Sequence, residues 1–139
     1  MKRPFRSAML LIPALALLSL PVYASPTGAP SAEEQRLYDL IMEYRAEEGL
    51  PPIPHSPSLT YVAQAHVRDL EAHFVREGRC NAHSWSANGE WTPCCYTLDH
   101  AEAECMWLKP RELTEYEGYG FEIAYSYSAG AGAEDALSS

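Results

Sequence analysis

The stretch from Cys80 to Cys105 constrains this chain most, because it contains all four cysteines of the 139-residue sequence. It reads CNAHSWSANGEWTPCCYTLDHAEAEC and lies downstream of a candidate export signal. An even number of cysteines in a small exported domain indicates disulfides, which stabilise a domain that has room for only a small core. We therefore expect two disulfides to hold an otherwise irregular segment in shape.

Four cysteines allow three pairings. A bond between the neighbours Cys94 and Cys95 would need a strained geometry, so we expect one of them to join Cys80 and the other to join Cys105, in nested or adjacent loops. The rival interpretation is a structural zinc site, since zinc prefers sulfur and nitrogen ligands. Its candidate ligands are Cys80, His83, Cys94 or Cys95, His100 and Cys105. The lack of a C-x2-C pair and the oxidising compartment favour the disulfides.

The export signal occupies residues 1–24. Lys2, Arg3 and Arg6 form a basic start, residues 8–20 are apolar, and Val22-Tyr23-Ala24 offers a signal peptidase site. The competing interpretation is an uncleaved membrane anchor, but the apolar run is short for a span and is interrupted by prolines. We expect cleavage after Ala24 and a secreted or periplasmic protein without a stable membrane span.

The remaining chain is strongly acidic. Loss of residues 1–24 removes three basic residues and leaves 7 Lys and Arg against 19 Asp and Glu, a net charge near −12. Affinity for nucleic acid comes largely from Lys and Arg that displace counterions. Nucleic acid and anionic lipid surfaces are therefore poor candidate partners, and the charge also favours solubility.

Two helices are predicted in the first half of the mature chain. Ser31-Ala32-Glu33-Glu34 is a capping box, and the following apolar positions, Leu37, Leu40, Ile41 and Tyr44, have helical spacing up to a stop at Gly49. A second helix begins at Ser56-Pro57 and ends near Gly78. Its apolar stripe consists of Leu59, Val62, Ala63, His66, Val67, Leu70 and Phe74.

A strand is predicted over residues 119–127, where Phe121, Ile123, Tyr125 and Tyr127 alternate with Glu122, Ala124 and Ser126. The fold class is therefore α+β. We divide the chain into a signal peptide (1–24), a linker (25–31) and one domain (32–139).

Histidine 83 is the first candidate for chemistry, because it follows the second helix closely and imidazole serves as both ligand and base. A packed or surface side chain is the alternative for this loop residue. His66 and His73 share the inner face of the second helix, and His66 is expected to be a core histidine. His55 and His100 belong to no pattern.

The order of these motifs resembles the CAP superfamily, also called the SCP or cysteine-rich secretory protein/antigen 5/pathogenesis-related 1 domain. The similarity covers roughly residues 32–137. It rests on the capped helix, the GLPP turn, the SPSL helix start, and then VAQAHVRDL, AHSW and GFEIA. The chain is most similar to a bacterial secreted member.

The resemblance implies an α-β-α sandwich around a cleft with two histidines and two acidic residues, which binds a divalent metal such as zinc in some members. On that likeness His83 is the first histidine and Glu122 is the first acid. The usual Gly-Glu-Asn motif appears here as Gly120-Phe121-Glu122, and the segment between His83 and Glu122 is longer than in many members. The second cleft histidine has no counterpart before Ser139, so we expect an incomplete, C-terminally truncated sandwich and weak metal affinity.

The resemblance implies a binding or interaction module for a lipid, a sterol or an envelope component. The alternative is a metal-dependent hydrolase that uses His83 and Glu122. The sequence contains no nucleophile elbow, no H-E-x-x-H and no phosphate-binding loop, so no catalytic residue is assigned and a non-enzymatic role is favoured. The oligomeric state stays open.

Overall fold

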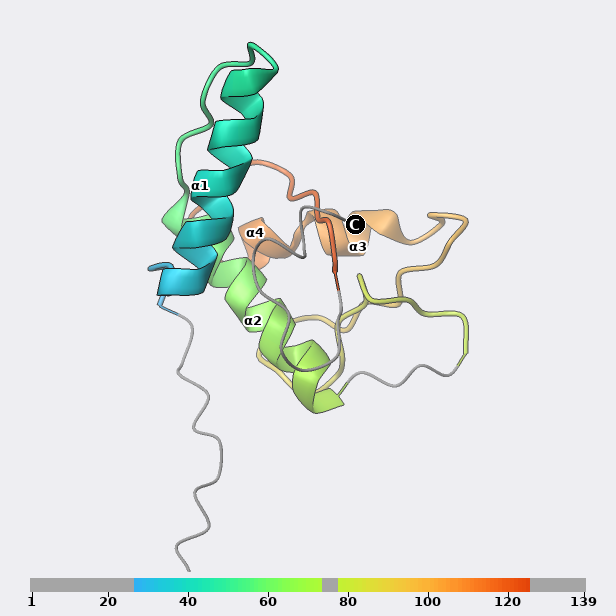
Figure 1. Cartoon of the computed structure of the whole chain (residues 1–139). Helices are drawn as coiled ribbons and strands as arrows, with labels where there is room; N and C mark the ends of the chain where they lie inside the picture. Colours follow the sequence, from blue (N-terminus) through green and yellow to red (C-terminus); the bar gives the residue numbers. More distant parts are fainter. Residues whose placement is uncertain (1–26, 74–77, 126–139) are drawn as a thin grey trace, which may run out of the picture.

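The computed structural model describes residues 27–73 and 78–125 (Figure 1). Within these ranges the chain forms four helices, α1 (Ala32–Glu47), α2 (Pro57–His73), α3 (Ala103–Trp107) and α4 (Lys109–Leu113). The predicted signal peptide, residues 25–26 of the linker and the C-terminal residues 126–139 lie outside the described residues. The described part therefore covers both predicted helices, the cysteine stretch and Glu122.

Helix α1 begins where the sequence predicted. The Ser31 hydroxyl accepts the Glu34 amide at 3.2 Å, and the Glu34 carboxylate accepts the Ser31 amide at 2.5 Å, which completes the capping box. The apolar face of this helix is not buried in the structure: α1 contains no buried residue, and Tyr44 is 58% exposed. Figure 1 shows the reason: the C-terminal end of α1, with the segment that leads back to α2, projects away from the cysteine stretch and the short helices.

Helix α2 forms the framework of the molecule. It begins at Pro57, where the Ser56 hydroxyl accepts the Leu59 amide at 3.3 Å, as predicted. Val62, Ala65, His66 and Asp69 are its buried residues, and they lie at helical spacing on one face. The last helical residue is His73; residues 74–77, where the helix was expected to continue, lie outside the described part.

The cysteine stretch is held by two disulfides, Cys80–Cys95 and Cys94–Cys105. One of the adjacent cysteines joins Cys80 and the other joins Cys105, as expected, but the loops overlap at Cys94-Cys95 and are neither nested nor separate. Among the described residues no cysteine is free. The sulfurs are therefore used in disulfides and do not form the rival zinc site.

The core lies between α2, the cysteine stretch and the two short helices. Its buried members are Val62, Ala65, Trp85, Cys94, Tyr96, Ala103 and Met106. Trp85 and Cys94 form an isolated antiparallel bridge, with backbone hydrogen bonds of 2.8 and 3.0 Å. Helix α4 packs against both α2 and α3. Neither α3 nor α4 was predicted from the sequence.

The predicted strand is not formed over residues 119–125, the part of it that the structure describes; residues 126–127 lie outside. A strand needs a partner for its backbone groups, and the described residues contain no sheet to supply one. The helical half of the expected fold is therefore present, whereas the sheet layer of the sandwich is not established. No helix in the described residues is long and apolar enough to cross a membrane.

Candidate functional site

Two histidines from different parts of the chain contact the two oxygens of one carboxylate. His66 Nδ1 is hydrogen-bonded to Glu122 Oε1, and His83 Nδ1 lies 2.8 Å from Glu122 Oε2. His66 comes from α2, His83 from the cysteine stretch, and Glu122 from the segment after α4. The cluster therefore joins three segments that lie far apart in the sequence.

His66 is fixed on every side. Its side chain is 3% exposed, its ring stacks on Trp85 with centroids 4.4 Å apart, and its Nε2 lies 3.0 Å from the Ser84 carbonyl oxygen. A carbonyl only accepts hydrogen bonds, so Nε2 carries a proton. The contact between Nδ1 and the Glu122 carboxylate needs a second proton between them, which is held by either the imidazole or the carboxyl group.

The pKa of Glu122 is set by its burial and by its two histidine neighbours. Burial raises the pKa of this carboxyl group, but the hydrogen bonds and positive charge of His66, together with those of His83, outweigh the burial and place its pKa below the usual value. The two histidines therefore favour the ionised form of the Glu122 carboxyl group.

His83 is more accessible than His66. Its side chain is 26% exposed, and its ring meets the Tyr96 ring edge-on with centroids 5.2 Å apart. Its backbone amide donates to Asn81 Oδ1 at 3.0 Å, which orients the loop after Cys80. Two residues later in this loop Trp85 enters the core, so the position of His83 follows from the packing of the cysteine stretch.

The structure brings together the two residues that the sequence singled out, His83 and Glu122, and adds His66. His66 is buried, as expected for a core histidine, yet it also contacts the carboxylate. The position of His66 on the inner face of α2 was the one sequence signal for this residue. Helical spacing predicted its burial but could not reveal its contact with Glu122. The other histidines lie elsewhere: His55 contacts Thr60, His100 contacts Tyr96, and His73 lines a separate cavity.

Asp69 is a buried acid on α2 that sequence reasoning did not single out. Its carboxylate accepts the Ser86 amide at 2.7 Å and the Ser86 hydroxyl at 2.5 Å. Because Asp69 and His66 both bind the loop of residues 84–86, they fasten the cysteine stretch to α2 at two points. Asp69 therefore sets the position of His83 without contacting the cluster.

A small apolar cavity adjoins the cluster, with a volume of about 100 Å³. Its walls come from α2, the cysteine stretch, the two short helices and the Glu122 segment. The lining residues are Leu59, Val62, Ala63, Trp85, Met106, Lys109, Pro110, Gly120, Phe121 and Glu122. The buried indole Nε1 of Trp85 has no hydrogen-bond partner among the described residues. The cavity is thus apolar, with a carboxylate and an unpaired donor on two residues of its lining.

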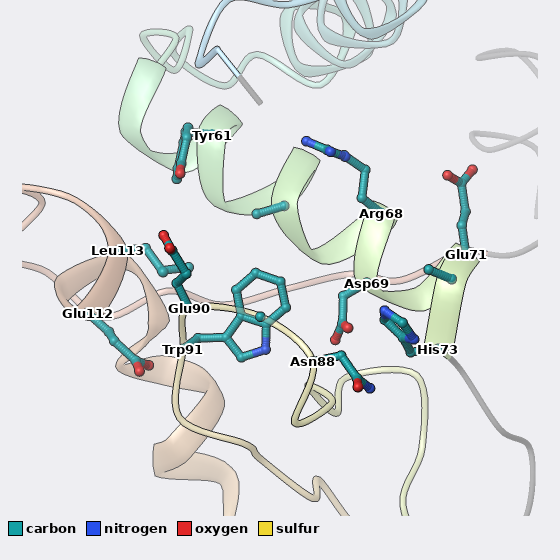
Figure 2. Close-up of a pocket in the computed structure, with 13 residues that line it drawn as sticks. Tyr61, Arg68, Asp69, Glu71, His73, Asn88, Glu90, Trp91, Glu112 and Leu113 are labelled. Carbon is teal, nitrogen blue, oxygen red and sulfur yellow. The ribbon is translucent and has the colours of Figure 1, made fainter. Parts of the chain in front are cut away.

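A larger cavity of about 630 Å³ is lined by α2 residues together with Asn88 to Trp91 and the end of α4 (Figure 2). Its acidic residues include Asp69 and Glu112, and both are already hydrogen-bonded, to Ser86 and to Lys109. Figure 2 shows Trp91 at the centre of this lining, where its indole donates to the Ser86 carbonyl at 2.9 Å. These polar groups serve the packing of the loop, so we assign the candidate site to the Glu122 cluster.

The donor types of the cluster match zinc, because two imidazoles and one carboxylate form a recurrent catalytic ligand set. His66 also has the outer hydrogen bond to a backbone carbonyl that metal-binding histidines usually make. The arrangement does not match: the two Nδ1 atoms contact different carboxylate oxygens, and no three His, Cys, Asp or Glu side chains of the described residues are placed to hold one ion. The described geometry is that of a hydrogen-bonded triad.

Comparisons with known proteins identify the family. Neither the curated proteins nor the solved structures give a match. A family model, that of the cysteine-rich secretory protein family, matches residues 38–130, which is more than half of the chain and includes α2, both disulfides and all three residues of the cluster. The chain therefore belongs to the CAP family of cysteine-rich secretory proteins.

Proposed function

We propose that this chain is a secreted or periplasmic CAP/SCP-like module that binds an apolar ligand with one hydroxyl group, such as a sterol or another lipid of the envelope. The observation that carries the proposal is the apolar cavity beside Glu122. A hydroxyl group both donates and accepts a hydrogen bond. The ligand's hydroxyl would therefore donate to the Glu122 carboxylate, while the rest of the ligand contacts the apolar walls.

The magnitudes favour an apolar ligand over a polar one. Burial of apolar surface contributes about 25 cal/mol for each Å², whereas a buried polar group without a partner costs roughly 1–3 kcal/mol. Lys109, the cavity's cation, already donates to the Thr92 carbonyl and to Glu112, so it offers no free charge to an anionic ligand. The Glu122 carboxylate would repel such a ligand as well.

The test is ligand binding with a filled cavity. Ala63 is an exposed residue at the rim of the cavity, so Ala63→Phe adds a ring at its mouth and should weaken binding of a labelled sterol by the disulfide-bonded protein. Val67→Phe is the matched control, since Val67 is also exposed and lies on the same helix, but it is outside the lining. Equal sterol binding by the wild type and Ala63→Phe would refute the site.

The alternative function is a metal-dependent hydrolase that uses His83 and Glu122. The observation in its favour is the set of two imidazoles and one carboxylate at a half-exposed position. His83→Ala separates the two functions, because His83 does not line the cavity: hydrolysis should vanish, whereas binding of the apolar ligand should persist. Zinc binding by the wild type, measured calorimetrically and lost in His83→Ala, is the further result that this alternative requires.

A further inference from the structure

The larger cavity of Figure 2, which we call the Trp91 cavity, takes no part in the Glu122 cluster. It is lined by residues of α2, by Asn88 to Trp91 and by the end of α4. Its volume of about 630 Å³ falls within the range of about 300–1,000 Å³ that ligand pockets occupy. None of its lining residues also lines the cavity beside Glu122, so it is a separate candidate for ligand binding.

The charged side chains of the Trp91 cavity divide into two groups. Asp69 and Glu112 are already hydrogen-bonded within the protein. Arg68 and Glu90, in contrast, form no hydrogen bond or ion pair with any residue of 27–73 and 78–125, and they do not pair with each other. Arg68 is nevertheless half-buried, and a guanidinium group has only donors to offer. The cavity therefore presents one cation and one anion that are both available to a ligand.

The loop that carries Glu90 is held in place by the Trp91 ring. The Trp91 indole donates to a backbone carbonyl of the same loop at 2.9 Å. The Gly89 backbone lies so close to this ring that a Cβ atom there would come within 2.2 Å of Trp91 Cζ2. The residues on both sides of Glu90 are thus fixed by one packed ring. In the view of Figure 2, Glu90 and Arg68 lie on either side of this ring, whereas Glu71 points away from it.

The two unpaired charges select the kind of ligand. A purely anionic ligand would meet the Glu90 carboxylate, and a purely cationic ligand would meet the Arg68 guanidinium, so each would be repelled by one of them. A zwitterion satisfies both, because its carboxylate accepts hydrogen bonds from the guanidinium while its ammonium group donates to the carboxylate. The rings of Trp91 and Tyr61 in the lining favour an aromatic body for the same ligand.

We propose that the Trp91 cavity binds a small zwitterion with an aromatic body, of which a free aromatic α-amino acid is the simplest form. Arg68 binds the carboxylate, Glu90 binds the ammonium group, and the ring of the ligand contacts Trp91 and Tyr61. This site goes beyond the proposed function, because the sterol or lipid occupies the other cavity. The two ligands therefore bind independently of each other.

Three probes with the same phenyl ring test the charge pattern. Near neutral pH phenylalanine is zwitterionic, phenethylamine is a cation and phenylpropionate is an anion. Each is titrated into the disulfide-bonded protein, and the NMR signal of the Trp91 indole N–H reports binding in this cavity. Phenylalanine should bind about tenfold more tightly than either analogue, because only phenylalanine makes both charged contacts.

Two variants remove one charge each. Arg68→Gln should lower the affinity for phenylalanine about tenfold, to that for phenethylamine, without weakening phenethylamine itself. Glu90→Gln should lower it by a similar factor, to that for phenylpropionate, without weakening phenylpropionate. The analogue that each variant retains reports that its cavity is intact. Arg79→Gln and Glu43→Gln are the matched controls, since both residues are exposed and outside the lining, and they should bind all three probes as the wild type does.

The outcomes decide the site independently of the proposed function. No binding of phenylalanine by the wild type, or equal affinity for the three probes, would overturn the proposal. Unchanged preference for phenylalanine in both Arg68→Gln and Glu90→Gln, or loss of the retained analogue in both, would overturn it as well. Sterol binding is measured on the same proteins and should not change; its absence from the wild type would refute the apolar site and leave the Trp91 cavity untouched.

Discussion

At the scale of single residues, Lys109 is the most costly group to bury. Its side chain is 2% exposed, and its ammonium donates to the Thr92 carbonyl and to Glu112 Oε2, each at 2.5 Å, and lies 5.6 Å from the centre of the Trp85 ring. A buried charge is tolerated only when it is paired and hydrogen-bonded. Loss of the Glu112 charge should therefore destabilise the protein more than loss of the Lys109 charge.

We expect Glu112→Gln to lower the free energy of unfolding by about 1–3 kcal/mol, because it leaves the buried ammonium without its anion. Lys109→Met should cost less, since it removes the charge and keeps an unbranched apolar stem beside Trp85. Urea denaturation of both variants measures which of them loses more free energy of unfolding. A larger loss in Lys109→Met would show that the ammonium itself stabilises the fold.

The same pair predicts an acid-dependent loss of stability. Burial raises the pKa of Glu112, but the hydrogen bonds from Lys109 and Thr92 outweigh it and lower the pKa below the usual 4.5. A depressed pKa adds stability above the unfolded-state value, and this is lost as pH falls through the folded-state value. The stability difference between wild type and Glu112→Gln should therefore stay constant near neutral pH and shrink below about pH 4.5. A difference independent of pH down to acid unfolding would contradict the assignment.

At the scale of elements, α1 depends on its own ends. It has no buried residue, so its stability comes from local interactions, above all the capping box of Ser31 and Glu34. Its link to α2 includes Gln64, whose side chain donates to the Ala29 carbonyl at 2.9 Å and to Glu34 at 3.1 Å. The cap and the link therefore share Glu34.

Loss of the cap should be measurable in α1 alone. Ser31→Ala is expected to cost about 0.5–2 kcal/mol, because the Glu34 amide loses its acceptor. Hydrogen exchange should become faster in the first turn of α1, with α2 unchanged. Ser56→Ala is the comparison at the start of α2, where the hydroxyl also accepts an amide. Equal acceleration of exchange in both helices after Ser31→Ala would refute a local effect.

The local signals account for which elements could be predicted. The starts of α1 and α2 were predicted because Ser31 and Ser56 act on amides three residues away. Helix α3 carries the disulfide at Cys105, and α4 packs against α2 and α3; local spacing encodes neither feature. The alternation of Phe121 and Ile123 with Glu122 suggested a strand. In the structure Phe121 and Ile123 are exposed, whereas Glu122 contacts the histidines.

The candidate site was also predictable only in part. His83 and Glu122 were found through their motifs and the family likeness, and the structure places their side chains 2.8 Å apart. His66 was placed in the core because it lies on the apolar stripe of α2. Its contact with Glu122 spans 56 positions of sequence, and no periodicity reports a contact over that distance.

At the scale of the whole molecule, the disulfides supply much of the stability that a small core cannot. The Cys80–Cys95 loop spans 15 residues, and closing a loop of that length contributes about 3 kcal/mol in the chain-entropy model. The Cys94–Cys105 loop spans 11 residues and should contribute slightly less by this effect. Cys94, however, is also a core residue with 4% exposure.

The Cys94–Cys105 disulfide closes the shorter loop, but its removal should therefore cost more stability than removal of the Cys80–Cys95 disulfide. Replacing Cys80 and Cys95 by Ala is expected to lower the free energy of unfolding by about 3 kcal/mol. Replacing Cys94 and Cys105 by Ala should cost about 1 kcal/mol more, because it also removes a buried sulfur from beside Trp85 and leaves a cavity. Urea denaturation without reductant measures both losses. A smaller loss for the second pair would show that loop closure alone determines how much each disulfide stabilises the protein.

The overlap of the two disulfides has a consequence for how the chain selects its own alignment. Cys94 and Cys95 are neighbours, so exchanging their partners would shift the chain by one position relative to Trp85. In an extended pair a shift of one residue turns every side chain to the opposite face, which would move Cys94 out of the core and Cys95 in. The two native disulfides are therefore compatible with the alignment in which Trp85 lies opposite Cys94, and once formed they oppose a shift to the neighbouring alignment.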